Sequence, residues 1–425
     1  MNYLILFYYH LLWTFLVFLS LPLSLIHKRF RLIDRIIIRL PPGIKSTKNI
    51  WIHALSVGEV NSTVPLIKVL KQRYPDNKII FSVKTRSGLD AAARLTGKLV
   101  DHIMPMPLDF WWSIIRTCYY INPLLYILVE TDLWPGTLMH LKHKQIPVML
   151  VNGRISPRTY KSHKRYAFIT KHIWDSLDIC LMQTELDRQR LLEIGVAPEK
   201  VKTVGNIKFD QDWKEMDQAE RKAWYHTLHL NPQDRIWVAG SLHQGEFEII
   251  INTFRKIRTQ FSDLRLIIAP RRIEWVEDIR MACADRGVSV ALKTNLSNNT
   301  PDYQVLILDS MGELARVYGL AEFSFVGGSL EPIGGHNLLE PASFGQPVLF
   351  GPYTHNFELM AERLIESGGG KRVQDGEDLI NMIQKLLLDS ALGRKMGLSA
   401  QAFVKMNQGT LEIVKREIDN YIAIS

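Results

Sequence analysis

Cysteine is scarce in this sequence, and we find neither internal repeats nor low-complexity segments. Only three of the 425 residues are cysteines, and they are far apart, without a CxxC motif or a Cys/His cluster at metal-ligand spacing. This argues against a disulfide framework and a structural zinc site, and it favours a reducing compartment. Asp210-Gln-Asp212 has a D-x-D form, but nothing nearby completes a coordination shell. We therefore expect no metal site.

No lysine or arginine precedes the apolar run of residues 3–26, whereas seven follow it between residues 28 and 48. As a helix this run would extend about 36 Å, enough to cross a bilayer with some tilt. A cleaved signal peptide is the alternative, but the run lacks a basic region before it and a small-residue cleavage site after it. The positive-inside rule therefore predicts a membrane anchor at 1–27, a single span, with the rest of the chain in the cytoplasm.

The following segment, 28–44, is basic and amphipathic. Arg31, Arg35 and Arg39 recur every fourth residue opposite an apolar side, which predicts an interfacial helix on anionic lipids of the inner membrane. A basic helix packed against its own domain is the alternative. The formal net charge of +9 does not indicate nucleic acid as a partner, because no aromatic-interleaved platform for single strands accompanies it.

Short apolar runs alternate with helical segments along the remaining chain, which is typical of parallel α/β sheets. Predicted strands at 49–54, 78–85, 124–130, 147–152, 179–184 and 201–205 form a Rossmann-like domain at 45–210. A polar linker at 211–234 precedes a second Rossmann-like domain at 235–391, with strands at 236–240, 264–270, 288–293, 305–308, 323–326 and 347–350. The final helical segment, 392–425, is expected to return toward the first domain. The predicted fold class is thus α/β, with two domains facing a cleft after an N-terminal transmembrane helix.

Polar residues follow the predicted strands of the first domain, at the edge where open α/β sheets bind ligands. Glu59, in the sequence Ser56-Val-Gly-Glu, opens a helix and is the candidate general base, since partial desolvation raises a carboxyl pKa. A favourable position at a helix start is the alternative. Glu130 ends a later strand and is a reserve base or an organiser of the site. Ser56 is expected near the cleft as an acceptor-site candidate. Arg154 would pair with an anionic acceptor or with a carboxylate of its own domain.

The segment 325–350 predicts a nucleotide pocket in the second domain. It reads as strand, glycine-lined loop, helix start, short helix and buried strand. Glycines such as Gly328 would leave backbone N–H groups open to a phosphate beside a helix N-terminus, while Glu340 reaches outward. Asn337 adds a polar group beyond those of an ordinary strand-to-helix turn, which remains the alternative.

Two other strand ends of the second domain carry candidate donor-site residues. Ser241 lies among small residues at a helix start, which suits a phosphate, whereas His243 beside it is expected to be structural. Arg271 ends the next strand, where a cation and exposed backbone could hold a base or a phosphate.

Several motifs, in this order, resemble those of the 3-deoxy-D-manno-octulosonic acid (Kdo) transferase family. They are Ser56-Val-Gly-Glu59, Glu130-Thr-Asp-Leu-Trp-Pro135, Gly205-Asn-Ile-Lys208-Phe-Asp210, Gly240-Ser-Leu-His-Gln-Gly-Glu246, Met311-Gly-Glu-Leu314 and the 325–350 segment. The resemblance implies a GT-B fold and an inner-membrane enzyme. It implies inverting transfer of Kdo from CMP-Kdo to a lipid A precursor, with no obligatory cofactor.

The resemblance also implies residue roles. The family's base falls on Glu59 and an electrostatic position on Lys208, while the donor-binding positions fall on Ser241, Arg271, Gly328, Ser329, Asn337 and Glu340. The sequence departs from the family where Arg272 replaces a histidine and Leu338 replaces a proline. Two other functions stay open from the residues alone, namely a membrane-bound GT-B transferase with a UDP-sugar donor and a non-catalytic nucleotide-binding scaffold at the membrane.

Overall fold

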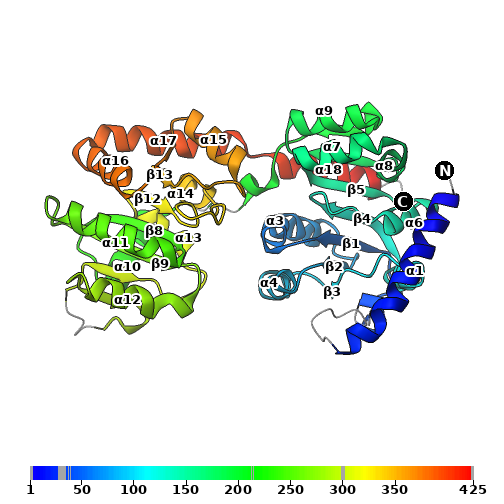
Figure 1. Ribbon diagram of the computed structural model, residues 1–425, viewed down its shortest axis with the longest axis horizontal. Coiled ribbons are helices and arrows are strands. Elements are labelled where there is room, and N and C mark those ends of the chain that lie inside the picture. The colour runs from blue at the N-terminus through cyan, green and yellow to red at the C-terminus, as the bar shows by residue number, and fades with distance from the viewer. Residues whose placement is uncertain are drawn as a thin grey trace. The chain divides into compact units, whose positions relative to one another are not determined.

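A computed structural model of the chain describes residues 3–26, 35–36, 38, 40–211, 213, 215–297 and 302–422. The chain divides into two compact units, Met1–Asp212 with Gln408–Ser425, and Trp213–Asn407. Each unit contains its own seven-stranded sheet, and all recorded strand pairs are parallel (Figure 1). The prediction of an α/β chain with two parallel sheets is therefore confirmed.

The sheet of unit 1 has the strand order β3-β2-β1-β4-β5-β6-β7. Its strands are β1 (Asn49–Ala54), β2 (Ile79–Val83), β3 (His102–Pro105), β4 (Pro123–Val129), β5 (Val148–Gly153), β6 (Ile179–Met182) and β7 (Val201–Thr203). Alternate residues of β1 enter different hydrophobic clusters, Ile50 and Ile52 one and Trp51 the other, because successive side chains point to opposite faces. Burial on both faces explains the continuous apolar runs in the sequence.

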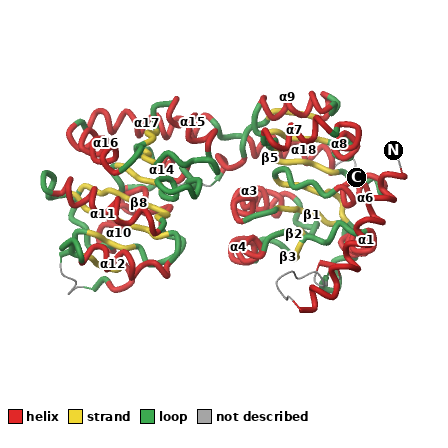
Figure 2. The backbone as a smooth tube through the Cα atoms, viewed as in Figure 1, coloured by secondary structure: helices red, strands yellow, loops and turns green. Residues whose placement is uncertain are grey.

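Helices cover this sheet on both faces (Figure 2). They are α1 (Tyr3–Ile26), α3 (Val57–Arg73), α4 (Arg86–Thr96), α5 (Trp111–Ile121), α6 (Pro135–His143), α7 (Pro157–Arg165), α8 (Ala167–Trp174), α9 (Glu185–Ile194) and α18 (Thr410–Ile422), with 3-10 turns η2 (Pro198–Lys200) and η3 (Ile207–Asp210). The last helix, α18, contributes Val414 and Ile418 to the core of unit 1.

The sheet of unit 2 has the order β10-β11-β9-β8-β12-β13-β14. Its strands are β8 (Arg235–Leu242), β9 (Leu264–Pro270), β10 (Val290–Leu292), β11 (Val305–Ile307), β12 (Phe323–Val326), β13 (Val348–Phe350) and β14 (Gly370–Arg372). Its helices are α10 (Gln218–Thr227), α11 (Gln244–Arg258), α12 (Val276–Ala284), α13 (Leu314–Val317), α14 (Leu339–Ser343), α15 (Glu358–Glu366), α16 (Gly376–Leu388) and α17 (Ser390–Met406), with 3-10 turns η4 (Ile273–Trp275), η5 (Lys293–Asn295) and η6 (Tyr318–Leu320). Helix α10 lies inside the segment expected to be a polar linker, and Arg221 on it donates to the carbonyl oxygen of Gly319.

Strand order reverses direction once in each sheet. In unit 1 the chain moves outward from β1 through β2 and β3 and then returns to pair β4 with β1. In unit 2 the corresponding neighbours are β8 and β12. The carboxyl ends of such neighbours leave a crevice where α/β sheets bind ligands. The loops after β1, β4, β8 and β12 are therefore the places to examine for chemistry.

Helix α1 covers the predicted anchor, but it packs against unit 1. Val17 clusters with Leu108 and Phe110, and the Tyr9 hydroxyl donates to the Asp109 carboxylate over 2.5 Å. Among the described residues, no helix combines the length and apolar character required to cross a bilayer. The predicted transmembrane helix is thus not found in this part of the chain, and the contacts of α1 with its own domain were not foreseen.

The basic segment after α1 is described only in part, and Arg31 and Arg39 lie outside the described residues. Arg35 is not directed at solvent. Its Nε donates to the carbonyl oxygen of Met106 over 2.8 Å, and its own carbonyl oxygen accepts from the Ser113 hydroxyl. At this position the expectation of an interfacial arginine is wrong, because the guanidinium satisfies buried backbone instead.

Candidate active site

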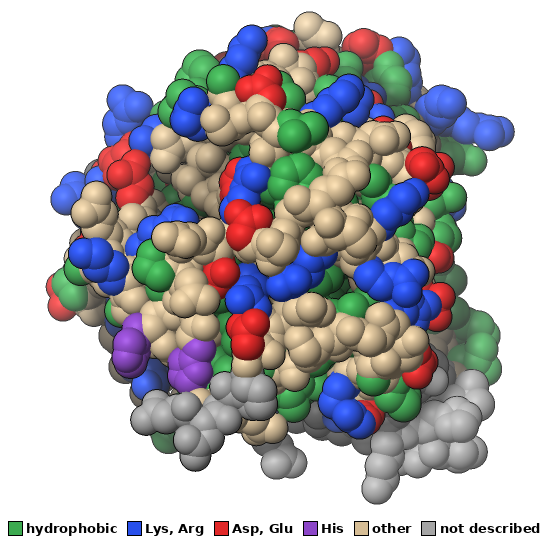
Figure 3. Space-filling model, turned by 90° about the vertical axis from the view of Figure 1, so that its left-hand side faces the viewer, with side chains coloured by type: hydrophobic (Ala, Val, Ile, Leu, Met, Phe, Trp, Pro, Cys, Tyr) green, Lys and Arg blue, Asp and Glu red, His purple; other side chains and the backbone are tan. Residues whose placement is uncertain are grey.

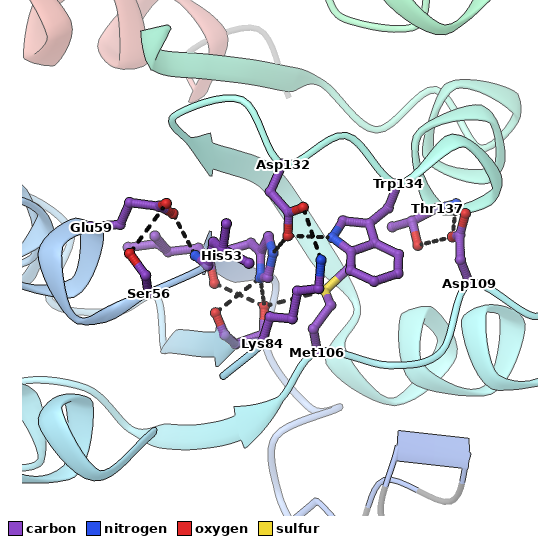
Figure 4. A network of polar contacts seen from close by, with 12 residues as sticks. His53, Ser56, Glu59, Lys84, Met106, Asp109, Asp132, Trp134 and Thr137 are labelled. Carbon is purple, nitrogen blue, oxygen red and sulfur yellow. Dashed lines mark hydrogen bonds and ion pairs between the residues drawn. The ribbon is translucent and has the colours of Figure 1, made fainter. Parts of the chain in front are cut away.

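Glu59 lies in the first turn of α3, directly after β1, and the residue is only 6% exposed. One oxygen accepts from the Leu55 backbone N–H over 2.5 Å, and the other is 3.5 Å from the Ser56 hydroxyl (Figure 4). Burial, followed by the negative charge of Glu130, raises the pKa of Glu59 to about 8, against a lowering effect of Lys208. A carboxyl group with such a pKa can take up a proton near neutral pH.

Glu130 lies just beyond β4 and forms an ion pair with Lys208, with 2.8 Å between Oε1 and Nζ. Its backbone has a φ of 59°, and Asn152, at the end of neighbouring β5, has a φ of 60°. Left-handed backbone is uncommon outside glycine and costs energy, so it persists only where the surroundings enforce it. The structure thus brings Glu59, Glu130 and Lys208 together at the reversal point of the unit 1 sheet.

A second polar network lies beside Glu59 and was not predicted. Asp132 accepts hydrogen bonds from His53 Nε2 over 3.2 Å and from Trp134 Nε1 over 2.9 Å, and it pairs with Lys84 (Figure 4). Burial tends to raise the pKa of Asp132, but His53, Lys84 and Trp134 outweigh it, so the pKa lies below its ordinary value. Lys84 lies 4.8 Å from the Trp134 ring centroid, which fixes a cation beside an aromatic face.

The two other unit 1 candidates also lie at this edge. Ser56 is the N-cap residue of α3, although its hydroxyl does not bond the helix backbone. Arg154 has an exposed side chain, and its backbone N–H and carbonyl both bond the Thr131 hydroxyl. Those bonds tie the loop after β5 to the loop after β4. The predicted roles of Ser56 and Arg154 stay predictions.

In unit 2, the glycine-rich loop is held by a buried carboxylate. Glu246, on α11 and 0% exposed, accepts from the backbone N–H groups of Gly328, Ser329 and Leu330 over 2.8 to 3.0 Å. It also accepts from the N–H of His243 over 2.9 Å. The expectation that these loop N–H groups lie open to a phosphate is therefore wrong for the described conformation, because Glu246 already occupies them.

Ser329 is likewise engaged within the protein. Its hydroxyl donates to the Val326 carbonyl oxygen over 2.6 Å and accepts from the Gly351 N–H over 2.8 Å. The side chain is completely buried. Ser329 therefore shapes the loop between β12 and β13, and its predicted contact with a donor stays untested.

Two histidines face one another beside the loop. His243 and His336 have stacked rings with their Nε2 atoms 2.9 Å apart. Burial lowers the pKa of His336 to about 4, with further lowering by Arg271 and His243. His336 is therefore neutral at physiological pH, and burial also lowers the pKa of His243. A single N–H can lie between the two nitrogens. The charge of Arg271 lowers the pKa of both histidines.

Glu340 and Asn337 lie in the same segment, where the Asn337 side-chain amide donates to the Glu340 carboxyl over 3.2 Å. Burial raises the pKa of Glu340, and the hydrogen bond from Asn337 and the charge of Arg271 oppose that rise. Helix α14 has only five residues, so the helix-dipole contribution expected from the sequence is small. Ser241, the second-last residue of β8, has a left-handed φ of 58°.

Asp210, the first carboxylate of the D-x-D sequence, binds protein. It accepts from the N–H groups of Gly409 and Leu411 over 2.6 and 2.7 Å, which fixes the start of α18. Asp212 lies outside the described residues. Where side chains are described, no group of three or more His, Cys, Asp or Glu residues could hold a metal ion.

Comparison with known proteins agrees with this architecture. Residues 26–211 match the family described as 3-deoxy-D-manno-octulosonic-acid transferase (kdotransferase). The 3-deoxy-D-manno-octulosonic acid transferase of Haemophilus influenzae is 34% identical over 371 residues, which cover 86% of this chain and 85% of that protein. A bifunctional glycosyltransferase/methyltransferase of Fusobacterium nucleatum is 32% identical over 346 residues, 81% of this chain but only 53% of that longer protein.

The solved structure of UDP-GlcNAc 2-epimerase from Neisseria meningitidis bound to UDP-GlcNAc has a TM-score of 0.59 at 13% identity, and the match covers 88% of this chain and 99% of that one. At this identity the likeness shows the fold alone, a GT-B-like pair of parallel α/β units. By its relatives the protein is thus a glycosyltransferase. It belongs to the 3-deoxy-D-manno-octulosonic acid transferase family of lipopolysaccharide biosynthesis.

Proposed function

We propose that this protein transfers Kdo from CMP-Kdo to a hydroxyl group of a lipid A precursor, lipid IVA, with inversion at the anomeric carbon. The observation that carries the proposal is the Glu59 carboxyl group, nearly buried at the reversal point of the unit 1 sheet with a pKa raised to about 8. Membership in the family supports Kdo as the group that is transferred. The donor CMP-Kdo and the lipid acceptor follow from the sequence resemblance and are part of the proposal.

In this reaction Glu59 removes the proton from the acceptor hydroxyl as its oxygen attacks the anomeric carbon of Kdo. The bond from that carbon to the phosphate oxygen breaks, and CMP leaves with the electron pair. The charge of Glu130 raises the pKa of Glu59 and the charge of Lys208, its ion-pair partner, lowers it. The ionised fraction of Glu59, which can act as the base, increases with pH.

Unit 2 would bind CMP-Kdo through the loops after β8, β9 and β12. Arg271 would supply a cation for the phosphate, and Glu340, hydrogen-bonded by Asn337, would accept from the ribose hydroxyls. A single phosphate leaving group can be stabilised by one or two cations and by backbone donors, without an obligatory metal or cofactor. We further propose that both units act on the cytoplasmic side of the inner membrane, where the lipid acceptor is reached from the bilayer surface.

The test is incubation of the purified chain with CMP-Kdo and tetra-acylated lipid A precursor, followed by mass spectrometry of the lipid. Whole Kdo units should be added, and Glu59→Gln should lower the rate by about 100- to 10,000-fold, the usual contribution of a general base. Glu199→Gln, an exposed residue of unit 1 outside the candidate site, is the matched control for loss of one carboxylate. Full activity of Glu59→Gln would remove Glu59 from the mechanism.

A UDP-sugar donor is the second candidate, because the structural neighbour above is solved with UDP-GlcNAc bound. Thermal protection by CMP-Kdo but not by UDP-GlcNAc supports the first proposal, and the reverse pattern supports the second. A non-catalytic scaffold would bind a nucleotide yet leave the lipid unchanged in mass.

A further inference from the structure

Unit 1 has a groove at the sheet edge opposite Glu59. It has a volume of about 1190 Å³ and is lined by residues that precede β1, β4, β5 and β6, together with the end of α5. In a parallel sheet the amino ends of the strands form one edge and the carboxyl ends the other, so this groove is separate from the candidate active site. Nothing in the proposed reaction uses it.

The groove is strongly basic. Lys45, Lys48, Lys142 and Lys144 line it, against a single carboxylate, Asp178. Lys142 pairs with Asp178 over 2.7 Å, and Asp178 also accepts from the backbone N–H of Val148, so this carboxylate is occupied. By contrast, Lys and Arg side chains alternate with Asp and Glu on the face drawn in Figure 3. The groove therefore concentrates positive charge that its own carboxylate does not balance.

Helix α5, which borders the groove, is apolar on both sides. Its inner side is buried through Ile114, Cys118 and Ile121. Its outer side exposes aromatic and aliphatic side chains at helical spacing, namely Trp111, Trp112, Ile115, Tyr119 and Tyr120, which are 36 to 59% exposed. A helix that is hydrophobic all round is normally covered by other material.

The charged and aromatic groups are in direct contact. The Lys45 ammonium lies 3.3 Å from the Tyr119 ring centroid, and the Arg116 guanidinium lies over both Trp112 and Tyr120. Tryptophan and tyrosine beside lysine and arginine are the combination found where proteins meet the headgroup layer of a bilayer. Helix α1 exposes further apolar residues, and its Val17 packs against Phe110 at the start of α5.

We propose that the outer side of α5 and this lysine groove form a docking surface for an anionic phospholipid bilayer, with lipid phosphates at the lysines and the aromatic rings among the headgroups. The inference rests on the proposed function in assuming a membrane-bound acceptor. Helix α5 begins next to Asp109, which binds the N–H groups of Gly136 and Thr137 at the start of α6, near the Glu130–Trp134 loop. Docking along α5 therefore keeps the catalytic edge at the bilayer surface.

The test measures partition of the full-length protein onto vesicles of phosphatidylcholine alone or mixed with phosphatidylglycerol. Lys45→Gln with Lys144→Gln should weaken binding to the anionic vesicles about 30-fold, since each lysine near such a surface contributes roughly a fivefold factor. Binding to neutral vesicles should not change. Lys371→Gln with Lys395→Gln, two exposed lysines of unit 2, makes the same charge change and should have no such effect.

Trp112→Ser with Tyr119→Ser should weaken binding to both kinds of vesicle, because the aromatic contribution does not depend on lipid charge. Equal partition of the Lys45/Lys144 variant and the wild type on anionic vesicles would overturn the proposal. A second result would also overturn it: inorganic phosphate stabilises the wild type but not the Lys45/Lys144 variant, while the two proteins bind vesicles equally. The groove would then be a site for free phosphate. Thermal protection by CMP-Kdo is measured on the same variants, so a failure of donor binding is distinguished from a failure of docking.

Discussion

Replacing Glu246 with glutamine should disorder the glycine-rich loop of unit 2. Each carboxylate oxygen accepts two backbone N–H groups: Oε2 those of His243 and Gly328, and Oε1 those of Ser329 and Leu330. Glutamine keeps one carbonyl oxygen and places an NH₂ group against the other two donors. Two hydrogen bonds to a charged group are lost, each of about 1.5–3 kcal/mol, so the expected destabilisation is about 3–6 kcal/mol.

The assay combines urea denaturation with hydrogen exchange at residues 327–330. In Glu246→Gln the unfolding transition of unit 2 should move to lower urea, and the loop amides should exchange faster, while unit 1 keeps its protection. Glu248→Gln is the control on the same helix, because Glu248 is exposed and its ion pair with Arg286 is a surface interaction of small energy.

Thermal protection by CMP-Kdo should be smaller in Glu246→Gln than in the wild type, because the backbone of residues 327–330 would no longer be held in place. A Glu246→Gln protein within about 1 kcal/mol of wild type, with unchanged loop exchange, would show that these four hydrogen bonds do not hold the loop, and the reasoning would fail.

Three further outcomes are expected. The transfer rate should increase with pH toward about 8, because Glu59 acts as a base only when it is ionised; a rate that is flat from pH 6 to 9 would contradict this. The pKa of Glu59 is raised by folding, so its protonated form contributes stability that is complete below about pH 4.5 and is lost as the pH rises to about 8. Lys208→Met should move the midpoint of that pH–rate profile upward, because the ammonium lowers the pKa of Glu59, and an unmoved midpoint would count against the coupling. Gly240→Ala should destabilise unit 2 by about 1–3 kcal/mol in thermal unfolding, because its Cβ would collide with the buried Tyr318 hydroxyl, whereas Gly393→Ala, in open helix surface, should not.

Strands buried on both faces were readable from the sequence. The strands β1, β4 and β9 are predominantly apolar because helices cover both sides of a parallel sheet. Of the four edge strands, β7 and β10 were predicted, whereas β3 and β14 were missed. The strands β3, with the sequence His-Ile-Met-Pro, and β14, with Gly-Lys-Arg, lie at sheet edges, are short and partly exposed, and carry little apolar signal.

Candidate residues next to strand ends could also be found from the sequence, because the chain direction in a parallel sheet puts every strand's carboxyl end on one edge. Glu59 and Glu130 were identified in this way. The hydrogen-bond partners of Glu246 could not be identified from the sequence, because Glu246 and Gly328 are 82 positions apart and only the pairing of β8 with β12 brings them together. His53 and Asp132, separated by 79 positions, meet through the pairing of β1 with β4.

The sequence alone determined the alternation of strands and helices, the family and the identity of the carboxylate beside the first strand, because these depend on local apolar runs and on motifs contiguous in the chain. Only the tertiary structure decided which groups are already bound to one another. It showed the loop amides held by Glu246, Arg35 turned into the domain and α1 packed on unit 1, since hydrogen bonding and burial depend on neighbours that the order of residues does not place.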